Sequence, residues 1–234
     1  MFRVFLASIA MMVVLFITFS YSKLKVFKDT ALNRALVDID GSCSFRESFD
    51  LDNSILFLGD SRIKDWKQTS PEKLEKKAFF LGVYGQTSAE LIREMKCLDF
   101  KGSNKKVVLQ IGVNDLKVIS LFPDLNDSII SNLKRNMIHI VELLKEQDFE
   151  IFILPIIPIS DSFDEWFFLW KDKSSASILH TNEFIESSLG DATIINISLL
   201  LNSKNVVDDL YAKDSLHLNA HAYGALNNSL KDYL

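Results

Sequence analysis

The sequence predicts an α/β fold built around a doubly wound parallel sheet. From about residue 51 onward, short apolar runs that suit buried strands alternate with segments of helical period, and this alternation is typical of strand–helix–strand units. Glycine-containing turns follow several of the apolar runs. Because open α/β sheets bind ligands at the carboxyl ends of their strands, functional residues are expected in these turns.

Five segments are predicted to be strands and four to be helices. The strands are Ser54 to Leu58, Ala78 to Val83, Lys106 to Ile111, Ile151 to Ile157 and Thr193 to Ile197. The helices are Ser88 to Met95, Asp127 to Lys145, Ser175 to Leu189 and Ala220 to Tyr233. Apolar residues recur at close to helical period in the second of these segments, and this pattern predicts a helix clearly.

The segment from Ser160 to Lys173 fits neither pattern. It contains large aromatic residues between Trp166 and Trp170. These side chains would either line a substrate pocket beneath a loop or short helix, or pack against the core.

Composition narrows the class of protein. A chain of 234 residues with 48% hydrophobic residues is sufficient for one globular domain and an appendage. Its net charge of −5 gives no basic surface for nucleic acid, so nucleic-acid binding is not expected. Cys43 and Cys97 have neither CxxC spacing nor a nearby histidine cluster, so a metal site is not expected, while one disulfide and two separate thiols both stay open.

The amino terminus carries an uncharged run of nineteen residues, Val4 to Ser22. As a helix it would be about 28 Å long, close to the thickness of a bilayer core. We therefore expect residues 1–22 to be a transmembrane anchor, with a cleaved signal peptide as the alternative. Residues 23–50 are expected to be a spacer and residues 51–234 the globular domain. Basic residues after the run would favour a cytoplasmic domain, but a short basic amino end is also typical of secretory signals, and we expect the domain to be extracytoplasmic.

A Gly-Asp-Ser turn ends the first predicted strand and places Ser61 at the carboxyl edge of the sheet. All three residues also favour ordinary turns. Two later turns lie at the same edge. Gly85 follows the second predicted strand and can present a backbone N–H at the start of a helix, or can be a plain turn glycine. Asn114 follows the third, where its amide can donate to a developing oxyanion or cap a helix.

An Asp-x-x-His segment precedes the last predicted helix. Its spacing places Asp214 and His217 on one side of a turn, so the carboxylate can bond one imidazole nitrogen while the other nitrogen faces a serine. A serine hydroxyl needs such an oriented base to act as a nucleophile. His221 is the rival base, but it has no acid placed as Asp214 is for His217.

Taken together and in this order, these four segments resemble the blocks of the SGNH hydrolases, also called the GDSL lipase and acylhydrolase family. The resemblance extends from about Ser54 to Tyr223. It departs from the family pattern at Arg62, where the GDSL motif has leucine. It also departs at Tyr84 and Gln86, which flank Gly85 where serine or asparagine and aspartate are commoner.

The resemblance implies a three-layer α/β/α sandwich with a five-stranded parallel sheet, similar to flavodoxin. It further implies ester hydrolysis in which Ser61 is the nucleophile, His217 the base and Asp214 its orienting acid. The oxyanion hole would comprise the backbone N–H groups of Ser61 and Gly85 and the side chain of Asn114, with no metal and no cofactor. The Ser61 turn is not the GxSxG elbow of the α/β-hydrolases, which has glycine on both sides of the serine.

Neither the motifs nor the fold identify the substrate. An anchored, exported enzyme would favour an O-acetyl group on a cell-surface carbohydrate. The alternatives are lysophospholipase or thioesterase activity on lipid acyl esters, and O-acyl transfer to a glycan. A non-enzymatic alternative is a membrane-tethered binding protein on an SGNH scaffold, although binding alone would not require Ser61, Asn114, Asp214 and His217 together.

Overall fold

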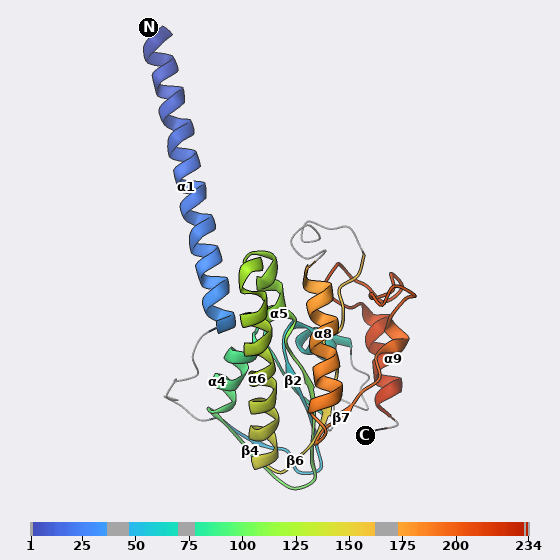
Figure 1. Cartoon of the computed structure of the whole chain (residues 1–234). Helices are drawn as coiled ribbons and strands as arrows, with labels where there is room; N and C mark the ends of the chain where they lie inside the picture. The colour runs from blue at the N-terminus through green and yellow to red at the C-terminus, as the bar shows by residue number, and fades with distance from the viewer. Residues whose placement is uncertain (1, 37–46, 70–77, 162–172, 232, 234) are drawn as a thin grey trace.

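The computed structural model describes residues 2–36, 47–69, 78–161, 173–231 and 233. Within these residues the predicted five-stranded parallel sheet is confirmed, with the strand order β3-β2-β5-β6-β7 (Figure 1). Counted along the chain within this sheet, that is the 2-1-3-4-5 order of flavodoxin-like folds. The strands are β2 (Ile55–Gly59), β3 (Ala78–Gly82), β5 (Lys105–Gln110), β6 (Phe149–Ile153) and β7 (Thr193–Ile194).

Helices cover both faces of the sheet and complete the predicted three layers (Figure 1). One face packs against α4 (Ser88–Met95), α6 (Asn126–Glu146) and α8 (Lys173–Ser188). The other packs against α2 (Ser61–Thr69) and α9 (Ala220–Leu230). The shorter elements are α5 (Val113–Leu116), η1 (Lys117–Ser120), η2 (Pro123–Leu125) and η3 (Ser198–Leu200).

The burial of both faces of the sheet explains why strand β2 is a continuous apolar run. Leu56 and Leu58 belong to the core cluster beneath α4 and α6, whereas Phe57 belongs to the cluster beneath α2 and α9. Successive side chains of a strand point to opposite faces, and both faces are covered here. The continuous apolar run is therefore the expected pattern for a central parallel strand.

The prediction did not include the second sheet or helix α2. Strand β1 (Glu47–Asp50) pairs in parallel with β4 (Leu98–Lys101) in a separate two-stranded sheet. Helix α2 was also missed, because most of its residues are polar. It is held by two buried apolar residues, Ile63 and Trp66, and by a hydrogen bond of 2.8 Å from Trp66 Nε1 to Asn227 Oδ1 in α9.

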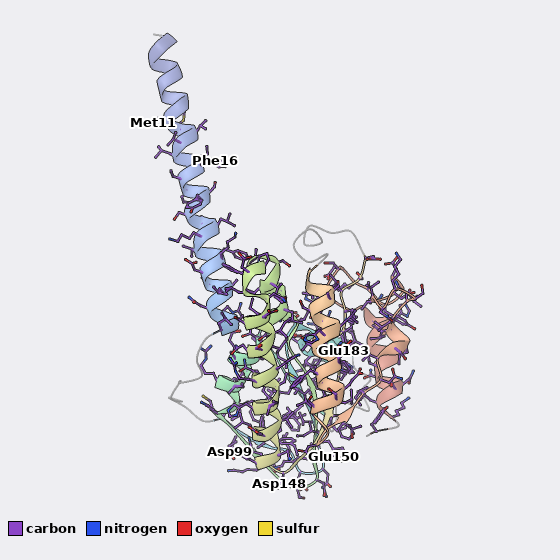
Figure 2. All side chains as sticks on the ribbon, in the orientation of Figure 1. Met11, Phe16, Asp99, Asp148, Glu150 and Glu183 are labelled. Atoms are coloured by element: carbon purple, nitrogen blue, oxygen red, sulfur yellow. The ribbon has the colours of Figure 1, made fainter. Side chains whose placement is uncertain are left out.

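Helix α1 (Phe2–Leu36) extends away from the other elements (Figure 1). Large apolar side chains on its projecting part are exposed, and Figure 2 labels two of them, Met11 and Phe16. In the part of the chain that the structure describes, no helix combines the length and the apolar character needed to cross a membrane. The transmembrane anchor over residues 1–22 stays a prediction.

The carboxyl-terminal part of α1 packs onto the domain. Ala35 is fully buried, and Asn132 of α6 donates a 2.8 Å hydrogen bond to its carbonyl oxygen. The segment predicted as a spacer, residues 23–50, thus includes a packed helix end and strand β1. Cys97 is disulfide-bonded, whereas Cys43 and the aromatic stretch from Trp166 to Trp170 lie outside the described residues.

Candidate active site

The three predicted turns and the Asp-x-x-His segment meet at one cavity of about 290 Å³. It lies at the carboxyl ends of β2, β3 and β5, where ligands of open α/β sheets bind. All five residues of the predicted site contribute to its lining, although they are spread over more than 150 positions of sequence. The lining residues are Ser61, Tyr84, Gly85, Asn114, Lys117, Asp214, Leu216 and His217.

Ser61 is the first residue of α2 and is separated from strand β2 by Asp60 alone. Gly59, the last strand residue, has φ +152°, and a Cβ there would lie 1.8 Å from the carbonyl oxygen of Gln110. Only glycine therefore lets β2 approach β5 so closely at this point. The resulting turn fixes Ser61 at the amino end of a helix, with 3% of its surface exposed.

Asp214 and His217 are paired as the spacing predicts. His217 Nδ1 lies 2.9 Å from Asp214 Oδ2, and the backbone N–H of His217 donates to Asp214 Oδ1 at 2.6 Å. Burial acts to raise the pKa of Asp214, but the hydrogen bonds from His217 and Leu216 outweigh it and hold the pKa below its ordinary value. The carboxylate is thus ionised at neutral pH and orients the ring.

His217 and Ser61 line the same cavity, but no hydrogen bond joins these two side chains in the described part of the chain. Catalytic hydrogen bonds are often long in proteins without substrate and tighten in the complex. The rival base His221 is exposed on α9 and is not part of this lining.

Gly85 and Asn114 line the same cavity as Ser61. Gly85 has φ +71°, a left-handed conformation that favours glycine. Asn114 is buried at the start of α5, where its Nδ2 donates to the carbonyl oxygen of Gln86 at 3.0 Å. A longer contact of 3.5 Å joins the same Nδ2 to Asp60 Oδ2. The backbone of the Gly85 turn and the amide of Asn114 are therefore fixed to each other.

Arg62 occupies the position at which the GDSL motif has leucine, and it is buried. Its guanidinium donates to the carbonyl oxygen of Leu216 at 2.8 and 3.0 Å and to that of Ile157 at 2.7 Å. Because Ser61 precedes Arg62 and Leu216 precedes His217, this side chain ties the nucleophile turn to the histidine turn. The departure from the motif thus has a structural use.

Two further carboxyl groups are buried beside the cavity. Burial raises the pKa of Asp60 to about 6, although the nearby Arg62 lowers it, and raises the pKa of Asp115 to about 7. Asp115 accepts hydrogen bonds from the backbone N–H of Ser88 at 3.0 Å and from its hydroxyl at 2.6 Å. Asp115 therefore anchors the amino end of α4 to the Asn114 turn.

Sequence reasoning missed three residues at the site. Tyr84 and Lys117 line the cavity, and burial lowers the pKa of Lys117. Tyr84 is adjacent to Gly85 and Lys117 follows the Asn114 turn, so these positions could have indicated that both residues lie at the site. Arg34 of α1 had no such signal, yet its Nη2 donates to the carbonyl oxygen of Gly85 at 2.8 Å. Within the described ranges no cluster of histidine, cysteine, aspartate and glutamate could hold a metal ion.

Neither the family models nor the curated proteins include a match to this sequence. Solved structures, in contrast, match over most of the chain. A protein from Streptococcus pneumoniae named for platelet activating factor is 20% identical with a TM-score of 0.63, and the match covers 96% of this chain and 98% of that one. A GDSL-like lipase from Bacteroides thetaiotaomicron is 18% identical with a TM-score of 0.61, covering 77% and 87%.

An acetyl xylan esterase is 15% identical with a TM-score of 0.55, and the match covers 77% of this chain and 99% of that one. Identities this low bear on the fold alone. The sheet order, the two helical layers and these structural matches agree with one another. The chain therefore has the fold of the SGNH hydrolases, the GDSL-like lipases and acylhydrolases, as the resemblance of its motifs predicts.

Proposed function

We propose that this protein is a serine ester hydrolase that acts through an acyl-enzyme on Ser61. The observation that carries the proposal is the convergence of Ser61, Gly85, Asn114, Asp214 and His217 on one small cavity. A nucleophile, an oriented base and oxyanion donors are the groups that two-step acyl transfer needs. Similar folds among GDSL-like lipases and an acetyl xylan esterase support the same class of reaction.

In the first step Ser61 Oγ attacks the ester carbon while His217 Nε2 takes the hydroxyl proton. Asp214, bonded to Nδ1, stabilises the imidazolium that forms. His217 then gives the proton to the leaving alcohol, and the acyl group stays on Ser61. Water, activated by the same ring, releases the acid and restores the serine.

The negative charge that develops on the carbonyl oxygen is stabilised by the backbone N–H groups of Ser61 and Gly85 and by Asn114 Nδ2. One hydrogen of Nδ2 is used by the carbonyl of Gln86, whereas the 3.5 Å contact to Asp60 is weak. An oxyanion can replace this weak contact. The donor is thus held in place before the charge appears, and such preorganised donors are effective for that reason.

Two classes of ester are candidates for the substrate. The sequence predicts an O-acetyl group on a cell-surface carbohydrate, and the similarity to an acetyl xylan esterase supports it. The alternative is a longer, lipid-like acyl group, favoured by an apolar cavity that adjoins the site. Acyl transfer to a glycan would use the same acyl-enzyme with a sugar hydroxyl in place of water. An extracytoplasmic location stays a prediction.

Labelling with a fluorophosphonate probe tests the enzyme directly, because the probe reacts with activated serines. We expect the wild-type protein to be labelled and the Ser61→Ala variant to lose labelling. The matched control is Ser215→Ala, which removes a buried serine next to Asp214 and should keep the label.

Absence of labelling and of ester turnover in folded wild-type protein would contradict the proposal and favour a binding protein on the same scaffold. Labelling that persists in Ser61→Ala would place the nucleophile elsewhere. Acetylated glycan formed from a donor ester would indicate transfer in place of hydrolysis.

A further inference from the structure

We propose that the amino-terminal helix α1 forms one wall of an acyl-binding subsite, and that the preferred substrates are esters of medium-length straight-chain fatty acids. The inference rests on the proposed esterase function and extends it to the substrate. It arises from a second cavity, of about 340 Å³, that adjoins the candidate active site between α1 and η1.

The second cavity shares Gly85, Asn114 and Lys117 with the first. Two of these are the predicted oxyanion donors, so the carbonyl of a bound ester would lie at the junction between the cavities. A substituent on that carbonyl is therefore placed next to the second cavity.

Proton transfer decides which part of the ester enters the second cavity. His217 must reach the leaving oxygen to protonate it, so the alcohol lies on the side of Asp214 and His217, which line only the first cavity. From the tetrahedral carbon, the acyl substituent points away from the leaving oxygen. It is thus directed past Gly85 and Asn114 toward α1.

The face of α1 that lines this cavity has helical spacing. Phe27, Ala31 and Arg34 lie at positions i, i+4 and i+7, and Thr30 lies between them on the same side. Val118 and Leu121, in and just after η1, form the facing wall. Small and apolar side chains therefore dominate the interior, and these suit methylene groups better than sugar hydroxyls.

The charged groups at the cavity are held by partners. Arg34 pairs with Glu90 through contacts of 2.7 and 2.9 Å and also donates to the Gly85 carbonyl. Burial and the neighbouring Arg34 lower the pKa of Lys117, whereas the charges of Asp60, Asp115 and Glu90 stabilise its ammonium form. Among the described residues that line the cavity, no positive charge is thus left without a carboxylate nearby, whereas a site for an anionic group would present one. The volume of the cavity falls at the lower end of the roughly 300–1,000 Å³ usual for small-molecule sites, which suits a medium chain.

A chain-length series of p-nitrophenyl esters, from acetate through butyrate and hexanoate to octanoate, tests the inference with the full chain. We expect kcat/KM of the wild type to rise from acetate to hexanoate or octanoate, by roughly fourfold for each methylene that becomes buried. Ala31→Phe, which fills the cavity from α1, should lower the octanoate-to-acetate ratio of kcat/KM by about tenfold or more.

Leu121→Phe narrows the cavity from the opposite wall and should lower the same ratio without altering α1. The matched control is Val26→Phe, which adds the same ring at an α1 position that is 63% exposed and outside the cavity lining. The octanoate-to-acetate ratio of kcat/KM in this control variant should equal that of the wild type. Agreement between the two filling variants separates a blocked cavity from a displaced helix.

A wild type that prefers acetate, or filling variants that leave the ratio unchanged, would overturn the acyl subsite while leaving the esterase proposal standing. Failure of the esterase proposal looks different. In that case no ester in the series is turned over and Ser61 is not labelled by a fluorophosphonate.

Discussion

Asn114 illustrates how a single side chain is prepared for its predicted role. It is 1% exposed and is bonded to the carbonyl of Gln86, next to Gly85. An exposed amide would have to give up water and side-chain freedom when the oxyanion forms, whereas this one has already done so during folding. The residue thus links the stability of the Gly85 turn to the chemistry proposed at Ser61.

Replacing Asn114 by alanine removes one oxyanion donor and is expected to lower kcat on the order of 10²- to 10³-fold. Initial rates with p-nitrophenyl esters measure the change, and a thermal unfolding scan shows whether the fold persists. Asn228→Ala, at an exposed position in α9, is the matched control and should keep full activity. Near-normal turnover in Asn114→Ala would remove this residue from the oxyanion hole.

Helix α1 contributes to the candidate site through contacts with residues more than 50 positions away in the chain. Near its carboxyl end, the hydroxyl of Thr87 donates a 2.7 Å hydrogen bond to the backbone oxygen of Arg34, and the Arg34 side chain bonds both Glu90 and the Gly85 carbonyl. Thr87 and Glu90 also form the capping box of α4. The start of α4 and the conformation of Gly85 therefore depend on α1.

Arg34→Met is expected to lower kcat on the order of tenfold with a smaller change in KM, because the Gly85 N–H is no longer held in position. The acetate ester is the right substrate, since it does not extend to the α1 wall and separates positioning from acyl binding. Arg34→Lys retains one donor and should recover part of the rate. The adjacent exposed Asn33→Ala serves as control, and an unaltered kcat in Arg34→Met would exclude a positioning role.

At the scale of the whole molecule, the buried carboxyl groups link stability to pH. Burial raises the pKa of Asp115 to about 7, above the roughly 3.9 of an unfolded chain. Between these values the folded state binds a proton that the unfolded state releases, so this contribution to stability is complete below about pH 4 and is lost as pH rises toward 7. Asp60, with its pKa raised to about 6, acts in the same direction.

Asp115→Asn keeps an acceptor for Ser88 but cannot ionise. The free energy of unfolding of the wild type, relative to this variant, is therefore expected to fall by about 3 kcal/mol as pH rises from about 4 to about 7. Urea denaturation at both ends of this range measures the difference. A difference between the two proteins that does not vary with pH would show that Asp115 ionises normally in the folded state.

The central sheet could be predicted because both of its faces are covered, which makes each strand a continuous apolar run with a distinct pattern. Helix α6 could also be predicted from the sequence, since its buried residues recur at helical period. Helix α2 could not be predicted, because only Ile63 and Trp66 provide its buried apolar contacts and its position depends on α9. Strands β1 and β4 were missed for a similar reason, since most of their residues are exposed.

The sequence by itself determined where the strands end and which chemical groups follow them. These groups are a serine, an amide, a glycine and an Asp-His pair. These are local properties, set by the residues that follow each strand. Tertiary structure alone decided the placement of α1, because Arg34 and Ala31 contact Gly85 and the second cavity across about 50 or more positions of sequence. The helical spacing of the α1 residues does not show which distant residues they face, so the wall of the proposed acyl subsite could be found only in the folded molecule.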